Sequence, residues 1–150
     1  TNWNILKKLF FRRHKQWPIS LFSHHEVTTG SMNVEEIRDF CLSLKGVTES
    51  FPFDETTLVF KVMGKIFCLM NLDGELSLNL KNRPEKNLEM REQFPCVQPG
   101  YHMNKVHWNT VWVDGSVSAR QLMAWIRESY EVVVDGLPRK LQAEWRDITD

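Results

Sequence analysis

Residues 57–81 read TLVFKVMGKIFCLMNLDGELSLNLK and form three short apolar segments separated by two turn signals. Gly64-Lys65 predicts the first turn. Asp73-Gly74 predicts a two-residue hairpin, because both central positions of such a turn need a positive φ. In the third segment Leu76, Leu78 and Leu80 alternate with Ser77 and Asn79. The pattern predicts an antiparallel meander of three strands with one face exposed to water.

A helix is predicted on the N-terminal side of this meander. Asn33 and Glu36 have the form of a capping box, and apolar residues recur after them with helical spacing until a stop near Gly46. These apolar residues are Ile37, Phe40, Cys41 and Leu44. The following segment, residues 47–55, is predicted as an ordered loop whose aromatic rings cover the sheet. The rings are those of Phe51 and Phe53.

A second helix and a further strand are predicted on the C-terminal side. Residues 85–94 follow Pro84, which suits the first turn of a helix. The inward-facing apolar residues of this helix are Leu88 and either Met90 or Phe94. Residues 108–113 predict a strand in which alternation places Trp108 and Trp112 on one face, and we expect both indoles to pack inward.

The longest helix is predicted after this strand. Ser118 and Gln121 suggest another capping box, and Pro138 ends the helical pattern. The order of helix, meander, helix, strand and helix contains no repeated strand–helix–strand unit. It therefore predicts an α+β fold, an antiparallel meander flanked by N- and C-terminal helices.

Composition and charge narrow the class of protein. The chain has 150 residues, is 42% hydrophobic and carries no formal net charge, which argues against a disordered chain and a uniformly basic nucleic-acid coat. This net charge of zero is the sum of two parts of the chain with opposite net charges. Residues 1–31 hold five basic residues against one acidic residue, whereas the remainder holds 14 basic against 18 acidic residues.

The first part also differs in sequence pattern. Residues 1–31 end in Gly-Ser before Met32 and are interpreted as a basic leader that is either non-native or disordered. The alternative is an amphipathic basic helix at residues 4–13 that contacts anionic lipid or nucleic acid. Residues 32–140 are predicted to form the single domain, and residues 141–150 a C-terminal tail.

Several kinds of site are not predicted. Cys41, Cys68 and Cys96 have apolar neighbours and fit reduced core positions, so no disulfide framework is expected. No C-x-x-C or H-x-x-x-H spacing occurs, and no metal or other cofactor is expected. No apolar run approaches the roughly 18 residues of a membrane span, and we expect a cytoplasmic protein. The common hydrolase, phosphate-loop and metalloprotease motifs are also missing, so we expect no enzyme.

Residues 99–109, PGYHMNKVHWN, combine side chains that can stack with side chains that can form hydrogen bonds. We treat this segment as the candidate site. Its candidate binding residues are Tyr101, His102, Asn104, Lys105, His107, Trp108 and Asn109. Lys105 is the strongest candidate, because an isolated cation in an aromatic-rich loop has the weakest structural explanation.

The chain resembles the YjbR/MmcQ family of small bacterial proteins over residues 32 to about 140. Five motifs occur in the family's order: ESFPF at 49–53, VFKV and GKIF at 59–67, the run from Leu78 to Lys81 with Pro84-Glu85, the aromatic loop at 99–111, and SYEVV at 129–133. The resemblance implies a double-wing, frataxin-like α+β fold. It also implies a DNA-binding role, although that label rests on fold analogy. The acidic ridge of an iron-binding frataxin is missing from the first helix.

Three functions follow as hypotheses. The first is DNA binding, with aromatic stacking on bases and cations neutralising phosphates. The cations are Lys61, Lys65, Lys81, Arg83 and Lys105. The second is a module that uses the 99–109 loop to bind a protein or a small anionic or planar ligand. The third is an enzyme with His102 or His107 in acid–base roles. The oligomeric state is left open.

Overall fold

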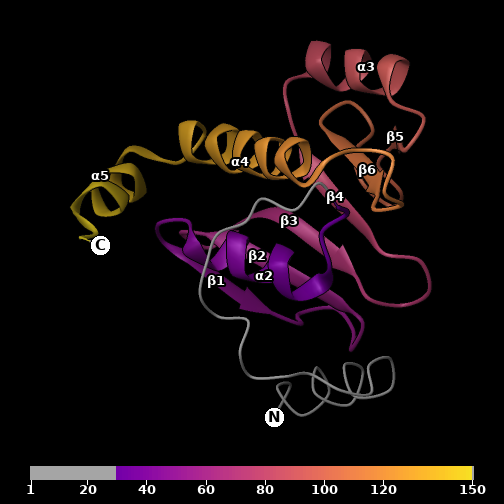
Figure 1. Ribbon diagram of the computed structural model, residues 1–150. Coiled ribbons are helices and arrows are strands. Elements are labelled where there is room, and N and C mark those ends of the chain that lie inside the picture. The colour runs from indigo at the N-terminus through magenta and orange to yellow at the C-terminus, as the bar shows by residue number, and fades with distance from the viewer. Residues whose placement is uncertain (1–29, 150) are drawn as a thin grey trace.

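A computed structural model gives the structure of residues 30–149. The alternative helix at residues 4–13 and all but the last two residues of the leader therefore lie outside the described residues. The sheet has six antiparallel strands in the order β1-β2-β3-β4-β6-β5 (Figure 1). The strands are β1 Val47–Ser50, β2 Thr57–Val62, β3 Lys65–Asn71, β4 Ser77–Lys81, β5 Val97–Pro99 and β6 Trp108–Trp112. The helices are α2 Val34–Ser43, α3 Pro84–Gln93, α4 Ala119–Asp135 and α5 Arg139–Asp147. The predicted α+β class is confirmed.

The predicted meander is strands β2, β3 and β4. Both turns differ from the prediction. The first is formed by Met63 and Gly64, with φ angles of 49° and 80°, and Lys65 already pairs with Val62 as part of β3. The second is not a two-residue hairpin, because residues 72–76 connect Asn71 to Ser77 and, of the predicted pair, only Gly74 has a positive φ, of 72°. Strand pairing places Leu58, Met70 and Leu78 in one row on one face of the sheet. Helices α2 and α4 cover that face, and their apolar residues share one buried cluster with the row. The core lies between this face and the two helices.

Two short strands extend the sheet beyond the prediction. The predicted loop at 47–55 is wrong over its first four residues, because β1 pairs with β2 from Val47 opposite Val62 to Ser50 opposite Val59. This pairing satisfies backbone groups that a loop would leave to water, and the alternating exposure of β1 suits an edge strand. Strand β5 forms the other edge by pairing with β6.

The prediction for the two indoles of β6 is wrong. Register pairs Val111 with Leu78 and Asn109 with Leu80, so Val111 and Asn109 face the core and are fully buried. Trp108 and Trp112 are half-buried on the opposite face. Alternation separates the two faces of a strand, but it does not show which face meets the helices.

Two apolar side chains expected to cover the core do not. On α3, Leu88 points away from the core of the domain and is 57% exposed, whereas Met90 is buried. Phe94 packs edge-on against Trp125 of α4, with ring centroids 4.9 Å apart. Phe53 is 66% exposed, so only the neighbouring ring of Phe51 packs against the core.

Helix α4 begins and ends close to the predicted points. Ser118 accepts a hydrogen bond from the backbone N–H of Gln121, and Gly136 follows the last residue. The expected tail, residues 141–150, contains most of α5. This helix is fastened by Trp145, whose Nε1 donates to the Tyr130 hydroxyl at 2.8 Å, while that hydroxyl donates to the Lys45 carbonyl oxygen at 2.5 Å.

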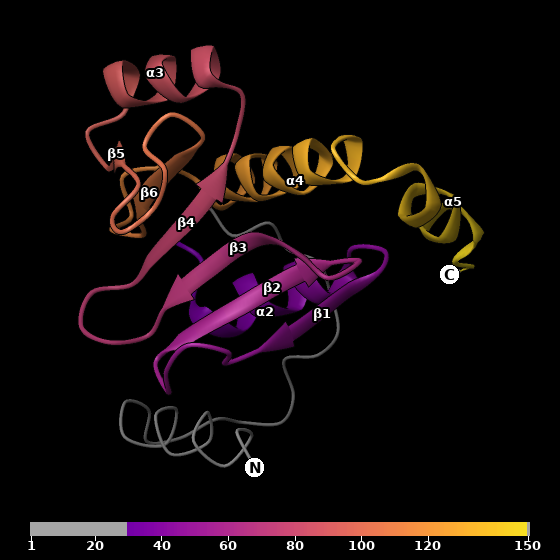
Figure 2. The ribbon, with the colours of Figure 1, turned by 180° about the vertical axis from the view of Figure 1, so that it is seen from behind.

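A buried serine of α4 joins the two halves of the sheet. The pairing of β3 and β4 ends at Cys68 opposite Leu80. Ser129, which is fully buried, lies just beyond it: its hydroxyl donates to the Phe67 carbonyl at 2.5 Å and accepts from the Lys81 N–H at 2.8 Å. Figure 2 shows β4 diverging from β3 toward β6 and α3 at this end. At this end of the sheet, β4 is therefore no longer paired with β3. The part of the sheet formed by β4, β6 and β5 carries the 99–109 loop.

The three cysteines are free and buried, as predicted for reduced core positions.

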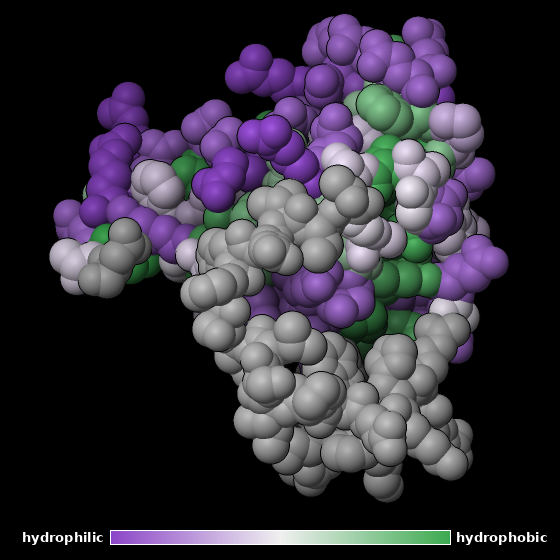
Figure 3. All heavy atoms as spheres, in the orientation of Figure 1, coloured by the Kyte–Doolittle hydropathy of each residue, from purple (hydrophilic) through white to green (hydrophobic). Residues whose placement is uncertain are grey.

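Within residues 30–149, none of the helices has both the length and the apolar character needed to cross a bilayer. On the face shown in Figure 3, hydrophilic side chains cover α3 and α4, while hydrophobic side chains reach the surface between α3 and α2.

Candidate functional site

Helix α3 holds the 99–109 loop through one arginine. Nε of Arg91 donates to Oδ1 of Asn109 at 2.6 Å, and its guanidinium also donates to the backbone carbonyls of Lys105 and Trp108. The planar guanidinium suits this task, because its several N–H groups point in fixed directions. Arg91 therefore fixes both the end of the loop and the start of β6.

A buried asparagine completes the attachment. Nδ2 of Asn87 donates to the carbonyls of Asn82 and Val106, and Nδ2 of Asn109 donates to the carbonyl of Asn87. The Asn82 backbone N–H donates to the His107 carbonyl at 3.1 Å. The loop is thus bound to α3 mainly through its own backbone, which leaves most of its side chains directed outward.

Close packing at Gly100 shapes the start of the loop. A Cβ atom at this position would lie 3.0 Å from the carbonyl oxygen of Trp108 and 3.0 Å from its Cβ. The Gly100 N–H donates to that carbonyl at 2.9 Å, and Nζ of Lys105 donates to the Gly100 carbonyl at 2.8 Å. Lys105 therefore has a structural role that the sequence did not reveal, which is to hold the start of the loop. Its ammonium group still has further hydrogens for another acceptor.

The loop then crosses the face of the sheet opposite the helices. The Tyr101 N–H donates to Oγ1 of Thr110, which in turn donates to Oδ1 of Asn79 at 2.5 Å. Asn79 was expected on the water-exposed face, and this covering loop explains why its cross-strand partner Thr110 is buried there. The backbone of Tyr101 is thereby fixed over β6.

The most exposed aromatic ring of the loop belongs to Tyr101. Its side chain is 70% exposed and lies beside His102, with ring centroids 4.0 Å apart. His102 has a φ of 55°, a left-handed conformation that turns the chain sharply after Tyr101. Because the backbone is held on both sides, the exposed ring is presented by a fixed loop and not by a free chain end.

The candidate cations divide into two groups. Lys81 lies opposite Trp108 in the register of β4 and β6, so both side chains are on the face crossed by the loop. Arg83 follows two residues later and is exposed. Lys61 and Lys65 belong to the β2–β3 hairpin. The turn of this hairpin lies beside Gly46, and Gly46 in turn lies close to α5. Figures 1 and 2 place this hairpin turn far from β6.

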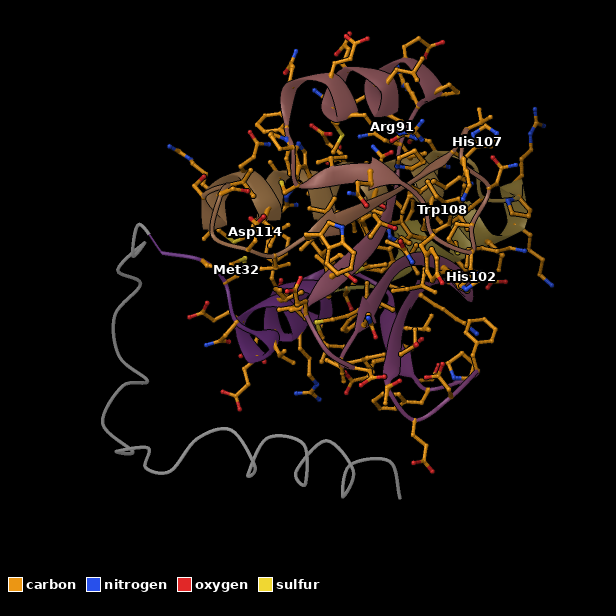
Figure 4. All side chains as sticks on the ribbon, turned by 90° about the vertical axis from the view of Figure 1, so that its right-hand side faces the viewer. Met32, Arg91, His102, His107, Trp108 and Asp114 are labelled. Atoms are coloured by element: carbon orange, nitrogen blue, oxygen red, sulfur yellow. The ribbon has the colours of Figure 1, made fainter. Side chains whose placement is uncertain are left out.

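We call the first group, with the rings beside it, the aromatic–basic surface. It consists of Lys81, Arg83, Tyr101, His102, Lys105 and Trp108. Figure 4 shows Trp108 and His102 along one side of the molecule together with Arg91 and His107, whereas Met32 and Asp114 lie on the other side. Residues 99–109 contain no carboxylate.

The remaining candidates serve the loop itself. Oδ1 of Asn104 accepts from the backbone N–H groups of Val106 and His107. Asn109 is fully buried in the attachment to α3. The side chain of His107 is exposed, while its backbone pairs with Asn82. Of the two amides predicted as ligand donors, Asn109 is therefore engaged within the protein at both polar atoms, whereas Asn104 uses only its oxygen there.

Sequence reasoning missed Arg91 and Asn87, which position the loop. The available signal was their spacing of four residues on the inward side of a helix that has few apolar residues there. Oδ1 of Asn87 is the one buried side-chain oxygen or nitrogen without a hydrogen-bond partner among the described residues. In the same part of the chain, no three His, Cys, Asp or Glu side chains are grouped to hold a metal ion.

Comparison with known proteins gives matches to one family. The family model described as YjbR matches residues 42–132. Among curated proteins, the uncharacterised protein YbdF of Escherichia coli O157:H7 is 39% identical over 113 residues, which are 75% of this chain and 93% of that protein. The uncharacterised protein YjbR of Escherichia coli strain K12 is 30% identical over 110 residues, covering 73% of this chain and 93% of that protein.

Solved structures with the same fold support these matches. The crystal structure of Deinococcus radiodurans protein DR2400, a DUF419 domain, has a TM-score of 0.72 and 38% identity, covering 80% of this chain and 91% of that chain. A crystal structure of a Pseudomonas syringae protein has a TM-score of 0.59 and 25% identity, covering 67% and 98% respectively. The similarity thus extends across nearly the full length of both solved chains.

Proposed function

The chain belongs to the YjbR family, and we propose that it is a non-enzymatic domain that binds nucleic acid through the aromatic–basic surface. The observation that carries the proposal is the exposed ring of Tyr101 on a loop held close to Lys81 and Lys105, with the exposed Arg83 two residues beyond Lys81. Proteins that bind nucleic acids combine such rings, which stack on bases, with cations that neutralise phosphates.

The local charge agrees with this ligand although the domain as a whole is acidic. The loop has one lysine and no carboxylate, and two further cations, Lys81 and Arg83, lie at the adjoining end of β4. Since charges on exposed groups are screened beyond about 8–10 Å at physiological salt, the nearest cations dominate the interaction with a bound phosphate. Binding is therefore local and of modest strength.

The arrangement favours nucleic acid over the alternative of a small polar ligand. A small-ligand pocket needs several convergent donors with free hydrogen-bonding capacity. Here Asn109 is buried, so of the two predicted amides only the exposed Asn104 keeps a donor group for a ligand. What the loop offers outward is a ring face and positive charge, which match bases and phosphates.

Charge reversal at two matched positions tests the proposal. Arg83→Glu changes an exposed cation inside the aromatic–basic surface, and Lys65→Glu makes the same change at the distant β2–β3 turn. Both variants carry the same net charge. We expect Arg83→Glu to weaken binding of a fluorescent oligonucleotide and to reduce the slope of log K against log salt by about 1, and Lys65→Glu to leave both unchanged.

The readout is fluorescence anisotropy over a series of salt concentrations, beginning at low salt. Absence of binding by the unmodified protein at low salt would overturn the proposal. Equal weakening by both variants would also overturn it, because the effect would then come from net charge and not from this surface.

A further inference from the structure

The inference concerns the kind of strand that the surface takes, and it rests on the proposed function. We infer that the aromatic–basic surface binds single-stranded nucleic acid in preference to duplex, with an unstacked base lying on the ring of Tyr101. The juxtaposition behind it is an exposed aromatic ring, in contact with His102, on a loop that carries Lys105 and lies beside Lys81.

The ring of Tyr101 can stack only on a base whose own face is uncovered. In a duplex, both faces of an internal base are covered by its neighbours, whereas a single strand can turn its bases outward onto aromatic side chains. Tyr101 is 70% exposed and touches His102 with the two rings tilted by 51°, so most of the tyrosine ring remains open to an unstacked base.

The number of cations fits a single strand held partly by stacking. Lys81, Arg83 and Lys105 allow about three phosphate contacts, which for a single strand gives a slope of log K against log salt near −2. A shallow slope with binding that survives moderate salt is the expected signature. A polyanion held by charge alone would instead lose its affinity steeply as salt rises.

The experiment compares strands of equal length by anisotropy. The probes are oligothymidine and oligouridine of about 15 nucleotides, within the range that one small domain occupies, and a blunt duplex of the same length. We expect at least one of the single strands to bind about tenfold or more tightly than the duplex. The two single strands separate DNA from RNA.

Three variants test the stacking contact. Tyr101→Phe keeps the aromatic ring and is expected to keep the affinity, while Tyr101→Leu removes it and is expected to lose about 5- to 100-fold. Phe53→Leu makes the same kind of change at an exposed ring on a loop at the opposite end of the sheet, and is expected to change nothing. Since both rings are exposed, thermal melting should show that all variants fold.

The outcomes separate this inference from the proposed function. A duplex that binds as tightly as either strand, and loses affinity in Arg83→Glu, overturns the single-strand inference but leaves nucleic-acid binding in place. An unchanged affinity in Tyr101→Leu also overturns the inference. If neither strand nor duplex binds, both the inference and the proposed function fail.

Discussion

Arg91 of α3 and Asn109 of β6 are joined by a 2.6 Å hydrogen bond from Nε to Oδ1. The same guanidinium donates to two backbone carbonyls of the loop that precedes Asn109. Because Asn109 is fully buried, the pair couples the position of the loop to the core of the sheet. The exposed candidate loop is thereby attached to the strand that follows it and to α3.

Removing Arg91 should therefore loosen the loop. Arg91→Ala leaves Oδ1 of Asn109 buried without a donor, and we expect a loss of about 1–3 kcal/mol in the free energy of unfolding. Amide hydrogen exchange at residues 100–108 should rise more than exchange in β2 and β3. The control is Arg120→Ala, an exposed arginine in the first turn of α4. A uniform rise in exchange across the sheet would contradict a local role for Arg91.

Ser129 is expected to stabilise the point where the sheet divides. Ser129→Ala leaves the Lys81 N–H and the Phe67 carbonyl without this partner, and we expect urea unfolding to show a loss of about 1–3 kcal/mol. Ser43→Ala, which removes a hydroxyl at the exposed end of α2, should cost much less. Similar losses of unfolding free energy in the two variants would show that the two hydrogen bonds of Ser129 add no stability of their own.

Gly100 should not tolerate a side chain. Its Cβ would meet the Trp108 backbone at 3.0 Å, a contact that no change of rotamer can relieve. We expect Gly100→Ala to lower the melting temperature and to weaken oligonucleotide binding together. Gly136→Ala, where the nearest atom would be 3.5 Å away, serves as the control. Wild-type melting and binding in Gly100→Ala would contradict the close packing of the loop.

The cysteines should be unreactive in the folded protein. Cys41 and Cys68 are fully buried, and burial raises the pKa of the Cys68 thiol well above its ordinary value, with a further contribution from its hydrogen bond to Cys41. Since the thiolate is the reactive form, an aromatic disulfide reagent should modify none of the three thiols before unfolding and all three in urea. Rapid modification of a thiol in the native protein would contradict this burial.

Asp54 should contribute to the pH dependence of stability. The pKa of its carboxyl lies below the ordinary value, because the carboxylate accepts hydrogen bonds from the backbone N–H groups of Thr56 and Thr57. A depressed pKa means that the stabilisation is present above the unfolded-state pKa of about 3.9 and is lost as the pH falls through the folded-state value.

The measurement compares the free energy of unfolding of the protein and Asp54→Asn from neutral pH down to acid. The amide keeps an acceptor oxygen but cannot carry the charge. We expect the difference between the two proteins to shrink below about pH 4. A difference that stays constant over the whole range would contradict the proposed origin of the pKa shift.

Much of the fold was predictable because its signals are local. The capping box of Asn33 and Glu36 forms within one turn of helix, as the structure confirms, and the reversals of the chain near Gly64 and Gly74 lie where the glycines predicted them, although neither is the exact turn that was predicted. The free, buried cysteines follow in the same way from apolar neighbours. The edge strand β1 was missed because its four residues have little apolar character and become a strand only by pairing with β2.

The candidate loop was predictable as a concentration of residue types, but its internal division was not. Tyr101 and Lys105 are exposed as a binding residue must be, whereas Asn109 is buried and bonded. The residues that secure the loop, Asn87 and Arg91, lie about 20 positions away in sequence and carry no motif. Hydrogen-bond partners this far apart depend on where whole elements come to rest.

The sequence by itself therefore determined where the meander reverses, the helix caps of Asn33 and Ser118, the α+β class and the family. These features depend on φ requirements and hydrogen bonds that close within a few residues. Only the tertiary structure decided that the helices cover the Val111 face of β6, leaving Trp108 on the other side, and that Lys65 lies far from Tyr101. The physical reason is that alternation defines two equivalent faces, and packing against distant helices makes one of them the core.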